Sequence, residues 1–516
     1  MIKKASDVTL KVLPVLATAE HLFYYEGPCR FGHGEALQPG YDRLANAQKA
    51  EAFLAKVKAC CDAAGGIELM EPVFLDRTDD WDNHEAMWDK ARVSADACDF
   101  AVCMQGIACD DLIMEFGERF KKPIATTPIS GFSGTITVAT MTARSNDYEA
   151  YGFYKWDDLT KTLRTLRARK VINTTKILCV TRFGNPTSYS SVDSFKSYEE
   201  ITAKLGVRFR FVNLHEFFEY FHEMPEGGNC TTPGRTNTPN ATREDFARAE
   251  ALADELMGGA EECTMEREKL VTSCLANVLV QKLMDLQDCN GFTMPCPDAC
   301  STRRLNEIGF TACLNHSLNM EQGIPSSCEY DVDCVLSQQA LIAVSGKSPY
   351  MGNTCPIPME NGHLSARFGT TPEQLARLEA LGDNENLYMM QHSVAHRRIH
   401  DNTRNSPYAI RQFAIDQGFG ATIRYNFDVD AGQKMTFCRF SPDGSKMFIG
   451  SGEIVMGGGY EGYNCSQLVY FKVKDQAKTW KAQCVAGNHC TMVYGDYVQA
   501  LTDLAEALGV EPVVAD

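Results

Sequence analysis

Long apolar segments are missing from this sequence. No stretch approaches the roughly 20 consecutive apolar residues that a membrane-spanning helix needs. Residues 1–18, MIKKASDVTLKVLPVLAT, include two lysines but no apolar stretch of signal-peptide length, because Asp7 and Thr9 interrupt it. We therefore expect a protein that neither spans nor binds a membrane and that is located in the cytoplasm.

Positive charge is also scarce. The 516 residues include 50 lysines and arginines against 67 aspartates and glutamates, and the formal net charge is -17 at pH 7. Binding to a polyanion depends on basic side chains that replace its counterions. The charge balance therefore argues against nucleic acid or an acidic membrane surface as a partner.

The motifs of several common enzyme and metal-site classes are absent as well. The sequence has no nucleophile elbow for serine or cysteine catalysis, and Cys296 and Cys300 have no second, well-spaced pair with which to form a structural zinc site. Gly457–Gly459 lies between β segments rather than between a strand and a helix, which disfavours a phosphate-binding loop. The segment His392–His396 has two histidines four residues apart, but a serine stands where zinc proteases have glutamate.

Cysteine, in contrast, is abundant. The 21 cysteines are scattered through apparent strands and helices, as at Cys60, Cys103, Cys179 and Cys438, rather than gathered in a short disulfide framework. In a chain of this length such spacing indicates buried, reduced thiols. We expect nearly all of them to be free, in agreement with a reducing compartment.

The length and the hydrophobic content allow more than one folded core. A single core rarely grows past about 250–300 residues, and 44% of this chain is hydrophobic. Short apolar runs at Val12–Leu16 and Phe100–Met104 flank the amphipathic stretch Lys49–Ala64, and the same rhythm restarts at Lys176–Thr181 and Val207–Val212. Alternation of strand and helix predicts parallel sheets covered by helices. We expect two such α/β units, the second starting near residue 170.

The rest of the chain shows other patterns. Glu223–Thr242 is rich in Gly, Pro, Asn and Thr and is expected to be an exposed loop, and one long helical pattern follows from Arg243 through Asp288. In the last third, Thr422–Val429 alternates polar and apolar residues, and a Ser-Pro-Asp-Gly turn signal joins Met435–Phe440 to Lys446–Ile449. These features predict antiparallel β-structure in a twisted or barrel-like sheet, followed by a terminal helix.

The first group of residues that could take part in chemistry is acidic. Glu329, Asp331 and Asp333 fall within five positions, just before the apolar helical stretch Val335–Val344. Carboxylates at the start of a helix are stabilised by its positive end, so the group is consistent with ordinary capping. A metal or acid–base role is the alternative, and the segment alone does not decide between the two.

A second candidate follows that helical stretch. Asn353 lies in a Met-Gly-Asn-Thr segment, one helix after Glu329. The ends of neighbouring strands in a parallel sheet meet at one edge, where α/β proteins place their sites. A strand, helix and strand would therefore bring Glu329 and Asn353 to one cavity. The alternative is that Asn353 belongs to a simple turn.

A third candidate lies near the C-terminus. His489 follows Asn488 in a Gly-Asn-His-Cys segment. A single histidine is more often a structural residue than a ligand, so both interpretations of His489 stay open.

Taken in order, these elements resemble the L-fucose isomerase and L-arabinose isomerase superfamily. The resemblance rests on an E-x-D element that opens a helix at Glu329, a strand-end M-G-N at Asn353, the segment HSVAH from His392, an antiparallel region, and GNHCTMVYGD before a final helix. It covers most of the chain and is most specific between Cys328 and Asp496. Each motif is weak alone, and their order and spacing support the resemblance.

The resemblance implies a fold, an activity and a cofactor. The implied α/β fold has two Rossmann-like domains, at residues 1–170 and 171–350, and a β-rich, barrel-like domain at residues 351–516. The implied activity interconverts an aldose and a ketose by an ene-diol proton transfer on an open-chain monosaccharide. The implied cofactor is a divalent metal, usually manganese, and the implied assembly is a homo-oligomer, often a hexamer.

The same resemblance assigns roles to residues of this chain. It implies a metal site formed by Glu329, Asn353 and His489. We further predict a catalytic group formed by Glu329, Asp331 and Asn353, and substrate contacts by His392 and Asn488. Asn353 departs from the family pattern, which has an acid at this position. An amide oxygen can coordinate a hard cation, but it has no charge and cannot act as a base. We expect Asp331 or Asp333 to supply the missing acid.

Two other functions stay open. One is a sugar-binding or regulatory homologue that has lost turnover, and the other is an epimerase that uses the same scaffold. The sugar is open as well. Arg397 and Arg398 could select a sugar with an anionic group, although a solvated face is the simpler interpretation of these two residues.

Overall fold

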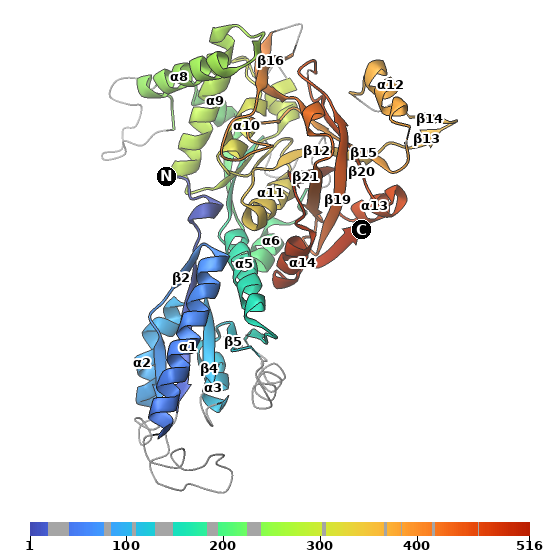
Figure 1. Cartoon of the computed structure of the whole chain (residues 1–516). Coiled ribbons are helices and arrows are strands. Elements are labelled where there is room, and N and C mark those ends of the chain that lie inside the picture. The colour runs from blue at the N-terminus through green and yellow to red at the C-terminus, as the bar shows by residue number, and fades with distance from the viewer. Residues whose placement is uncertain are drawn as a thin grey trace. The chain divides into compact units, whose positions relative to one another are not determined.

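The computed structural model shows a mixed α/β protein (Figure 1). It describes residues 1–18, 41–76, 84–105, 110–128, 148–182, 194–223, 239–301, 306–365, 369–382, 384–414, 418–462 and 464–515. The chain forms two compact units, one of residues Asp7–Arg167 and one of residues Met1–Ser6 with Ala168–Asp516. The division into three domains stays a prediction.

The smaller unit is built on a parallel sheet. Its strands are β1 (Leu10–Thr18), β2 (Ile67–Leu69), β3 (Val73–Asp76), β4 (Phe100–Gln105), β5 (Ile124–Thr126) and β6 (Ala150–Tyr151). Their order is β2-β1-β4-β5-β6, and β3 also pairs with β1. β1 contains the predicted apolar run and is buried almost throughout, as expected of a strand that is covered on both faces.

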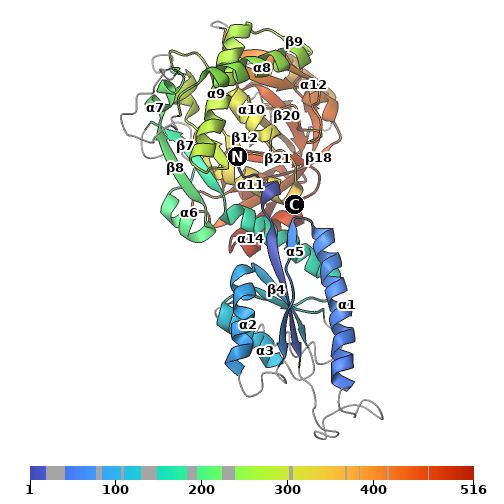
Figure 2. The same cartoon turned by 90° about the vertical axis from the view of Figure 1, so that its left-hand side faces the viewer.

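Helices cover both faces of this sheet. They are α1 (Tyr41–Ala64), α2 (His84–Ala97), α3 (Asp110–Phe120) and the first part of α5 (Trp156–Asn173). Alternate side chains of β1 enter different cores: Leu13 and Val15 pack with α2 and α3, whereas Val12 and Leu16 pack with α1 and α5. Figure 2 shows α2 and α3 on one side of the sheet and α1 on the other. This layering is Rossmann-like, as predicted.

The larger unit begins with a second parallel sheet. Its order is β11-β10-β7-β8, formed by β7 (Lys176–Thr181), β8 (Arg208–Asn213), β10 (Gly291–Thr293) and β11 (Ser326–Ser327). The accompanying helices are α6 (Tyr198–Leu205), α7 (Leu214–Glu219), α8 (Arg243–Gly259), α9 (Arg267–Leu286), α10 (Cys313–Glu321) and α11 (Val332–Ser345). The strand predicted at Lys176–Thr181 is confirmed.

The helical pattern predicted from Arg243 through Asp288 is wrong as a single helix. Gly258 and Gly259 end α8, and the chain then forms the short strand β9 (Glu262–Cys263) before α9 begins. β9 pairs with a strand from much later in the chain, a partner that local periodicity does not reveal. Most of the preceding predicted loop, Glu223–Thr242, lies outside the described residues.

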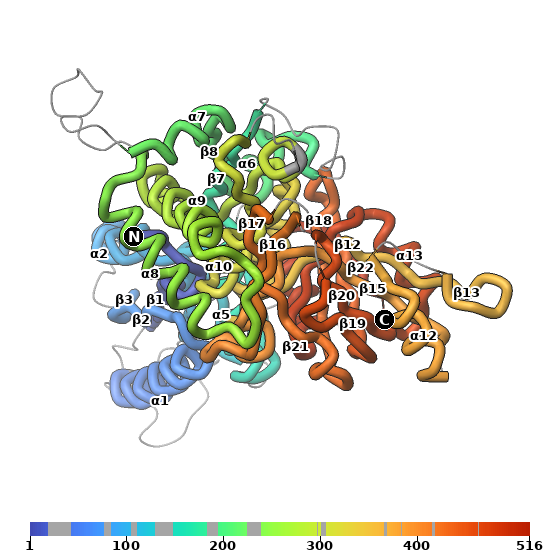
Figure 3. Tube along the Cα trace, turned by 90° about the horizontal axis from the view of Figure 1, so that it is seen from above, coloured from blue at the N-terminus to red at the C-terminus, as the bar shows by residue number. Residues whose placement is uncertain are grey.

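Six antiparallel strands close into a barrel near the C-terminus. They are β12 (Tyr350–Pro356), β15 (Leu387–His392), β18 (Lys434–Phe440), β19 (Lys446–Gly457), β20 (Gln467–Lys472) and β21 (His489–Tyr494). The order is β18-β21-β12-β15-β20-β19, and β19 pairs back with β18 to close the ring. Figure 3 shows these strands gathered together, coloured from yellow-orange to red. The predicted antiparallel pairing across the Ser-Pro-Asp-Gly turn is confirmed as β18 and β19.

The remaining elements lie between and after the barrel strands in the sequence. They are β13 (Met359–Glu360), β14 (His363–Leu364), α12 (Pro372–Ala380), β16 (Tyr408–Ala414), β17 (Phe419–Tyr425), α13 (Gln476–Gln483), α14 (Val498–Ala507) and β22 (Glu511–Ala515). The predicted terminal helix, α14, is followed by β22, which pairs in parallel with β19. None of the described helices combines the length and the apolar character of a transmembrane segment.

Two predictions about sheet membership are wrong. The segment around Thr422 is antiparallel, but as β17 it pairs with β16 in a separate sheet and not in the barrel. Glu329 and Asn353 also do not follow two strands of one parallel sheet. Glu329 comes just after β11 of the parallel sheet, whereas Asn353 lies in β12 of the barrel, because α11 leads from one to the other and packs on β18 and β21.

Candidate metal centre

Three side chains from distant segments meet in the larger unit. Glu329 comes just after β11, His392 is the last residue of β15, and His489 is the first residue of β21. Nε2 of His392 lies 3.4 Å from Oε1 of Glu329, and Nε2 of His489 lies 3.5 Å from Oε2 of the same carboxylate. One ligand atom of each residue lies within 4.8 Å of the other two, so this group could hold a metal ion.

The burial and hydrogen bonding of the group fit a cation. The side chains of His392 and His489 are 0% and 2% exposed, whereas the Glu329 side chain is 20% exposed. Within the described chain, no hydrogen bond reaches Nε2 of either histidine or Nδ1 of His392. Buried polar atoms are nearly always paired. Imidazole nitrogens beside a carboxylate are ligands for divalent metals, so a divalent ion held here would account for the Nε2 atoms that make no hydrogen bond.

Asp331 orients the His489 imidazole through a hydrogen bond to its Nδ1 atom. Nδ1 of His489 lies 2.8 Å from Oδ2 of Asp331, and an ionised carboxylate can only accept, so the imidazole donates from Nδ1. In the neutral imidazole this leaves the lone pair on Nε2, which faces Glu329, as in metal-binding histidines backed by a carboxylate. Burial lowers the pKa of His489, but the hydrogen bond to Asp331 and the charge of Glu329 outweigh it and raise this pKa overall.

Arg439 of β18 holds Asp331 in turn. Both side chains are 0% exposed. Nη1 of Arg439 donates over 2.8 Å to Oδ2 of Asp331, and Nη2 donates over 3.0 Å to Asp333. Burial raises the pKa of Asp331, but Arg439 and the other partners outweigh it and bring this pKa well below its usual value. The Asp331 side chain is fully buried, and Arg439, His489 and the Cys334 N–H occupy both of its oxygens, so these contacts favour a positioning role over the predicted catalytic role.

The backbone at Glu329 is strained. Glu329 and Tyr330 have φ values of 62° and 61°, in the left-handed region that residues with a Cβ rarely enter. Each such residue costs about 1–3 kcal/mol and persists only where the surroundings impose it. Here the Tyr330 N–H donates to the Met294 carbonyl over 3.0 Å, and the Tyr330 side chain is buried. The turn directs the Glu329 carboxylate at the two histidines, and strain at such a position is typical of functional sites.

Asn353 and Asn488 adjoin His489. Asn488 donates a side-chain hydrogen bond to Oδ1 of Asn353. Asn353 is the cross-strand partner of His489 in the pairing of β12 with β21, and such partners share one face of a sheet. Gly352 has a packing role, because a Cβ there would lie 2.7 Å from the carbonyl oxygen of Gln391. The roles of both asparagines stay predictions.

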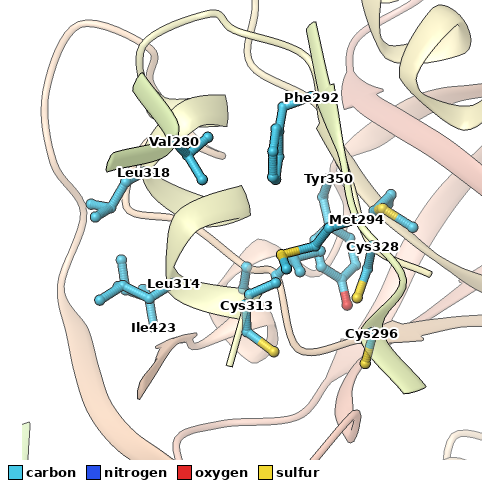
Figure 4. Close-up of a cluster of buried hydrophobic side chains, with 14 of the residues drawn as sticks. Val280, Phe292, Met294, Cys296, Cys313, Leu314, Leu318, Cys328, Tyr350 and Ile423 are labelled. Carbon is cyan, nitrogen blue, oxygen red and sulfur yellow. The ribbon is translucent and has the colours of Figure 1, made fainter. Parts of the chain in front are cut away.

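Buried thiols also adjoin the site. Cys328 directly precedes Glu329, and hydrogen bonds from Cys300 and Cys328 bring the pKa of Cys296 well below its ordinary value. Figure 4 shows Cys296, Cys313 and Cys328 among buried side chains of one core. All cysteines in the described part of the chain are free, and most of them are buried, as predicted.

The prediction that Arg397 lies on a solvated face is wrong. Arg397 is 6% exposed. Its Nη2 donates to Oε2 of Glu321 over 2.7 Å, and its Nη1 donates to Glu255 over 3.0 Å. Because both carboxylates neutralise it, Arg397 is not free to select a substrate.

Sequence reasoning missed two other arginines, Arg424 and Arg439, which are both fully buried. The sequence does contain a signal for them, because each interrupts an otherwise mostly apolar strand, as in Met435–Phe440. A charged residue at such a position conflicts with local patterning and often marks a functional or strained site.

Comparisons with models of known protein families and with curated proteins give no match.

Proposed function

We propose that the protein is a metal-dependent aldose–ketose isomerase that acts on an open-chain monosaccharide. The main support is the buried group of Glu329, His392 and His489, in which both Nε2 atoms are unpaired and face one carboxylate. The motif order shared with the L-fucose and L-arabinose isomerases supports the same activity. It also supports manganese as the metal and a homo-oligomer as parts of this proposal. The free, mostly buried cysteines support a cytoplasmic location as a further part of it.

Glu329 is the proposed base. Isomerisation moves a proton between C1 and C2 of the sugar, so it needs an ionised group within reach of the carbon-bound proton. Burial raises the pKa of Glu329, but His392 and His489 outweigh it, and this pKa lies below its ordinary value. The carboxylate is therefore ionised at neutral pH, and its 20% exposure leaves it accessible to a substrate.

The metal and the substrate need residues that hold them and residues that orient those ligands. Glu329, His392 and His489 would hold the metal, which when bound supplies a Lewis acid for the negative charge that develops on the sugar oxygens. Asp331 and Arg439 keep Nε2 of His489 directed at the site. Asn353 and Asn488 offer uncharged amide groups that suit sugar hydroxyls.

A sugar-binding homologue without turnover is the second candidate. The observation in its favour is the amide of Asn353, which cannot replace the acid that the isomerase family has at this position. A sugar epimerase is a further variant of the proposal, since it needs the same proton abstraction by Glu329.

The test follows proton transfer directly. Purified protein with Mn²⁺ is incubated with a panel of neutral and anionic aldoses in D₂O, and NMR detects ketose formation and deuterium at C1 or C2. We expect both signals, and Glu329→Gln should reduce them by about 10²–10⁴-fold, as for other lost acid–base groups. Glu360→Gln, which changes an exposed glutamate of β13, is the matched control and should have no effect.

The outcomes separate the candidates. A C2 or C3 epimer as the product would identify an epimerase. Binding of a sugar without product or deuterium would favour the second candidate. Full activity in a folded Glu329→Gln protein would show that the base has been misassigned.

A further inference from the structure

Arg424 of β17 is a buried arginine without a carboxylate partner in the described chain. It is 0% exposed. Its Nη2 donates over 2.8 Å to the carbonyl oxygen of Asn464, while its Nε and Nη1 make no hydrogen bond. Burial lowers the pKa of Arg424 to about 10, so the guanidinium is still charged at neutral pH.

The surroundings of Arg424 do not supply a negative charge at neutral pH. The titratable groups with the largest effect on it are the Cys313 and Cys465 thiols, the Tyr350 phenol and the Arg411 guanidinium. Burial raises the pKa of both thiols and of the phenol, so all three are neutral in the folded protein. Arg411 is also positive, but its charge is paired with Glu262, 2.6 Å away.

The other two buried arginines show how this chain normally compensates such a charge. Arg397 pairs with Glu321, and Arg439 pairs with Asp331 and Asp333. Removing a guanidinium from water without a counter-charge is strongly unfavourable. Arg424 therefore has the charge and the two unpaired donor atoms of a site for an anion.

A series of contacts links the surroundings of Arg424 to the candidate metal centre. Its neighbour Cys313 is hydrogen-bonded to the Ser393 hydroxyl, with the two atoms 3.0 Å apart, and the same hydroxyl lies 3.9 Å from the sulfur of Cys465. Its third neighbour, Tyr350, accepts a hydrogen bond of 2.8 Å from the backbone N–H of His392. Thus three groups that act electrostatically on Arg424 contact residues 392–393, where β15 ends and the metal group begins. The next residue of β17, Tyr425, also donates its backbone N–H over 3.1 Å to Oε1 of Gln467, which is the cross-strand partner of His392.

We propose that Arg424 binds an anionic group of the substrate, so that the site takes a sugar that carries a negative charge, such as a sugar acid or a sugar phosphate. The reaction at this sugar rests on the proposed isomerase function, whereas its binding does not. An arginine serves this purpose well because its guanidinium hydrogen-bonds to carboxylate and phosphate alike. A buried polar group of this kind discriminates strongly, since a neutral sugar would leave the guanidinium unpaired.

Direct binding tests the assignment. Isothermal titration with Mn²⁺-loaded protein compares D-galacturonate with D-galactose and D-glucose 6-phosphate with D-glucose. We expect the anionic member of at least one pair to bind at least about 10²-fold more tightly than its neutral partner. The pair that shows the preference distinguishes a carboxylate from a phosphate. Equal binding of both members in both pairs would overturn the proposal, whatever the variants do.

Variants then locate the preference. Arg424→Met keeps much of the side-chain length and removes the charge, so the anionic sugar should lose most of its advantage, whereas Arg424→Lys should retain part of it. Arg411→Gln is the matched control on β16, because Arg411 already pairs with Glu262, 2.6 Å away, and its loss should leave the preference intact. An unchanged preference in a folded Arg424→Met protein would overturn the role of Arg424. If that variant does not fold, Arg424→Lys decides, and an undiminished preference there would count against the proposal.

Failure of this inference and failure of the proposed function can be told apart. Anionic sugars that bind through Arg424 without proton exchange would refute the isomerase and leave the anion site standing. Isomerisation of neutral sugars, with no preference for anionic ones, would refute the anion site and leave the isomerase standing.

Discussion

His396 is a buried histidine whose two ring nitrogens both make hydrogen bonds. Nε2 lies 3.0 Å from the carbonyl oxygen of Pro349, and Nδ1 accepts from the backbone N–H of Arg398 over 3.3 Å. The imidazole is therefore neutral, with its proton on Nε2, and protonation of Nδ1 would break the second bond. Burial lowers the pKa of His396 from 6.5 to about 4.

This lowered pKa predicts a loss of stability in mild acid. Below pH 6.5 the unfolded chain binds a proton at residue 396, whereas the folded chain binds this proton only near pH 4 and below. The free energy of unfolding should therefore fall as the pH drops through this window, with at most about 1.4 kcal/mol per pH unit from this residue. The free energy of unfolding, measured with urea at several pH values, should depend less steeply on pH for His396→Gln than for the wild type. Equal slopes would mean that His396 titrates alike in both states.

At the residue scale, motif order led to part of the site. Glu329 and His489 were both selected from the sequence, and the structure brings them together with His392, which had been assigned to the substrate. The contacts of Arg424 and Arg439 could not be predicted. Which way a side chain on a strand points, and what lies opposite, depends on pairings between segments that are distant in the chain.

The N-terminus of α11 links a structural element to the site. Asp331 caps this helix by accepting from the Cys334 N–H over 3.0 Å, and it also pairs with Arg439 and His489. Asp331→Asn keeps an acceptor for the cap but removes the charge. We expect the free energy of unfolding to fall by about 2–3 kcal/mol. This is less than the roughly 3–5 kcal/mol typical of a fully broken buried pair, because Asp333 still contacts Arg439.

The same change should weaken metal binding by about 10–100-fold, because His489 loses the partner that sets its orientation. Urea unfolding and a Mn²⁺ titration measure the two effects. Asp475→Asn is the matched control: Asp475 caps α13 by accepting from the Lys478 N–H over 2.9 Å, but it is exposed and its cap contact involves no ion pair. Asparagine caps as well as aspartate does, so this control should change little. Equal effects of the two substitutions would reduce Asp331 to a helix cap.

At the element scale, local signals predicted whether a segment forms a helix or a strand better than they predicted which strands pair. The apolar run at Lys176–Thr181 and the turn between β18 and β19 were found because periodicity and turn residues are local properties. The placement of β12 in the barrel, and of β17 outside it, was not found. Closure of the barrel depends on β18 pairing with β21 as well as with its hairpin partner β19. The pairing of β18 with β21 joins distant segments, and the alternation within one strand does not specify it.

For the whole molecule, the location of the metal group predicts where a metal stabilises. Glu329, His392 and His489 all belong to the larger unit, which comprises Met1–Ser6 and Ala168–Asp516. A ligand that binds only the folded state stabilises it by mass action, by about 2.7 kcal/mol at a concentration of 100 times its Kd. Mn²⁺ should therefore raise the melting temperature and slow hydrogen exchange in peptides around these three residues, without protecting peptides of residues 7–167.

A net charge of -17 also attracts divalent cations loosely, so the controls must separate site binding from general charge neutralisation. Loose binding would act on both units alike and would survive the loss of one histidine. His392→Gln removes one proposed ligand and should abolish the local protection. His396→Gln changes a buried histidine four residues away that is outside the metal group, and it should respond to Mn²⁺ as the wild type does. Equal protection of both units, or an undiminished response in His392→Gln, would show that these three residues do not form the metal site.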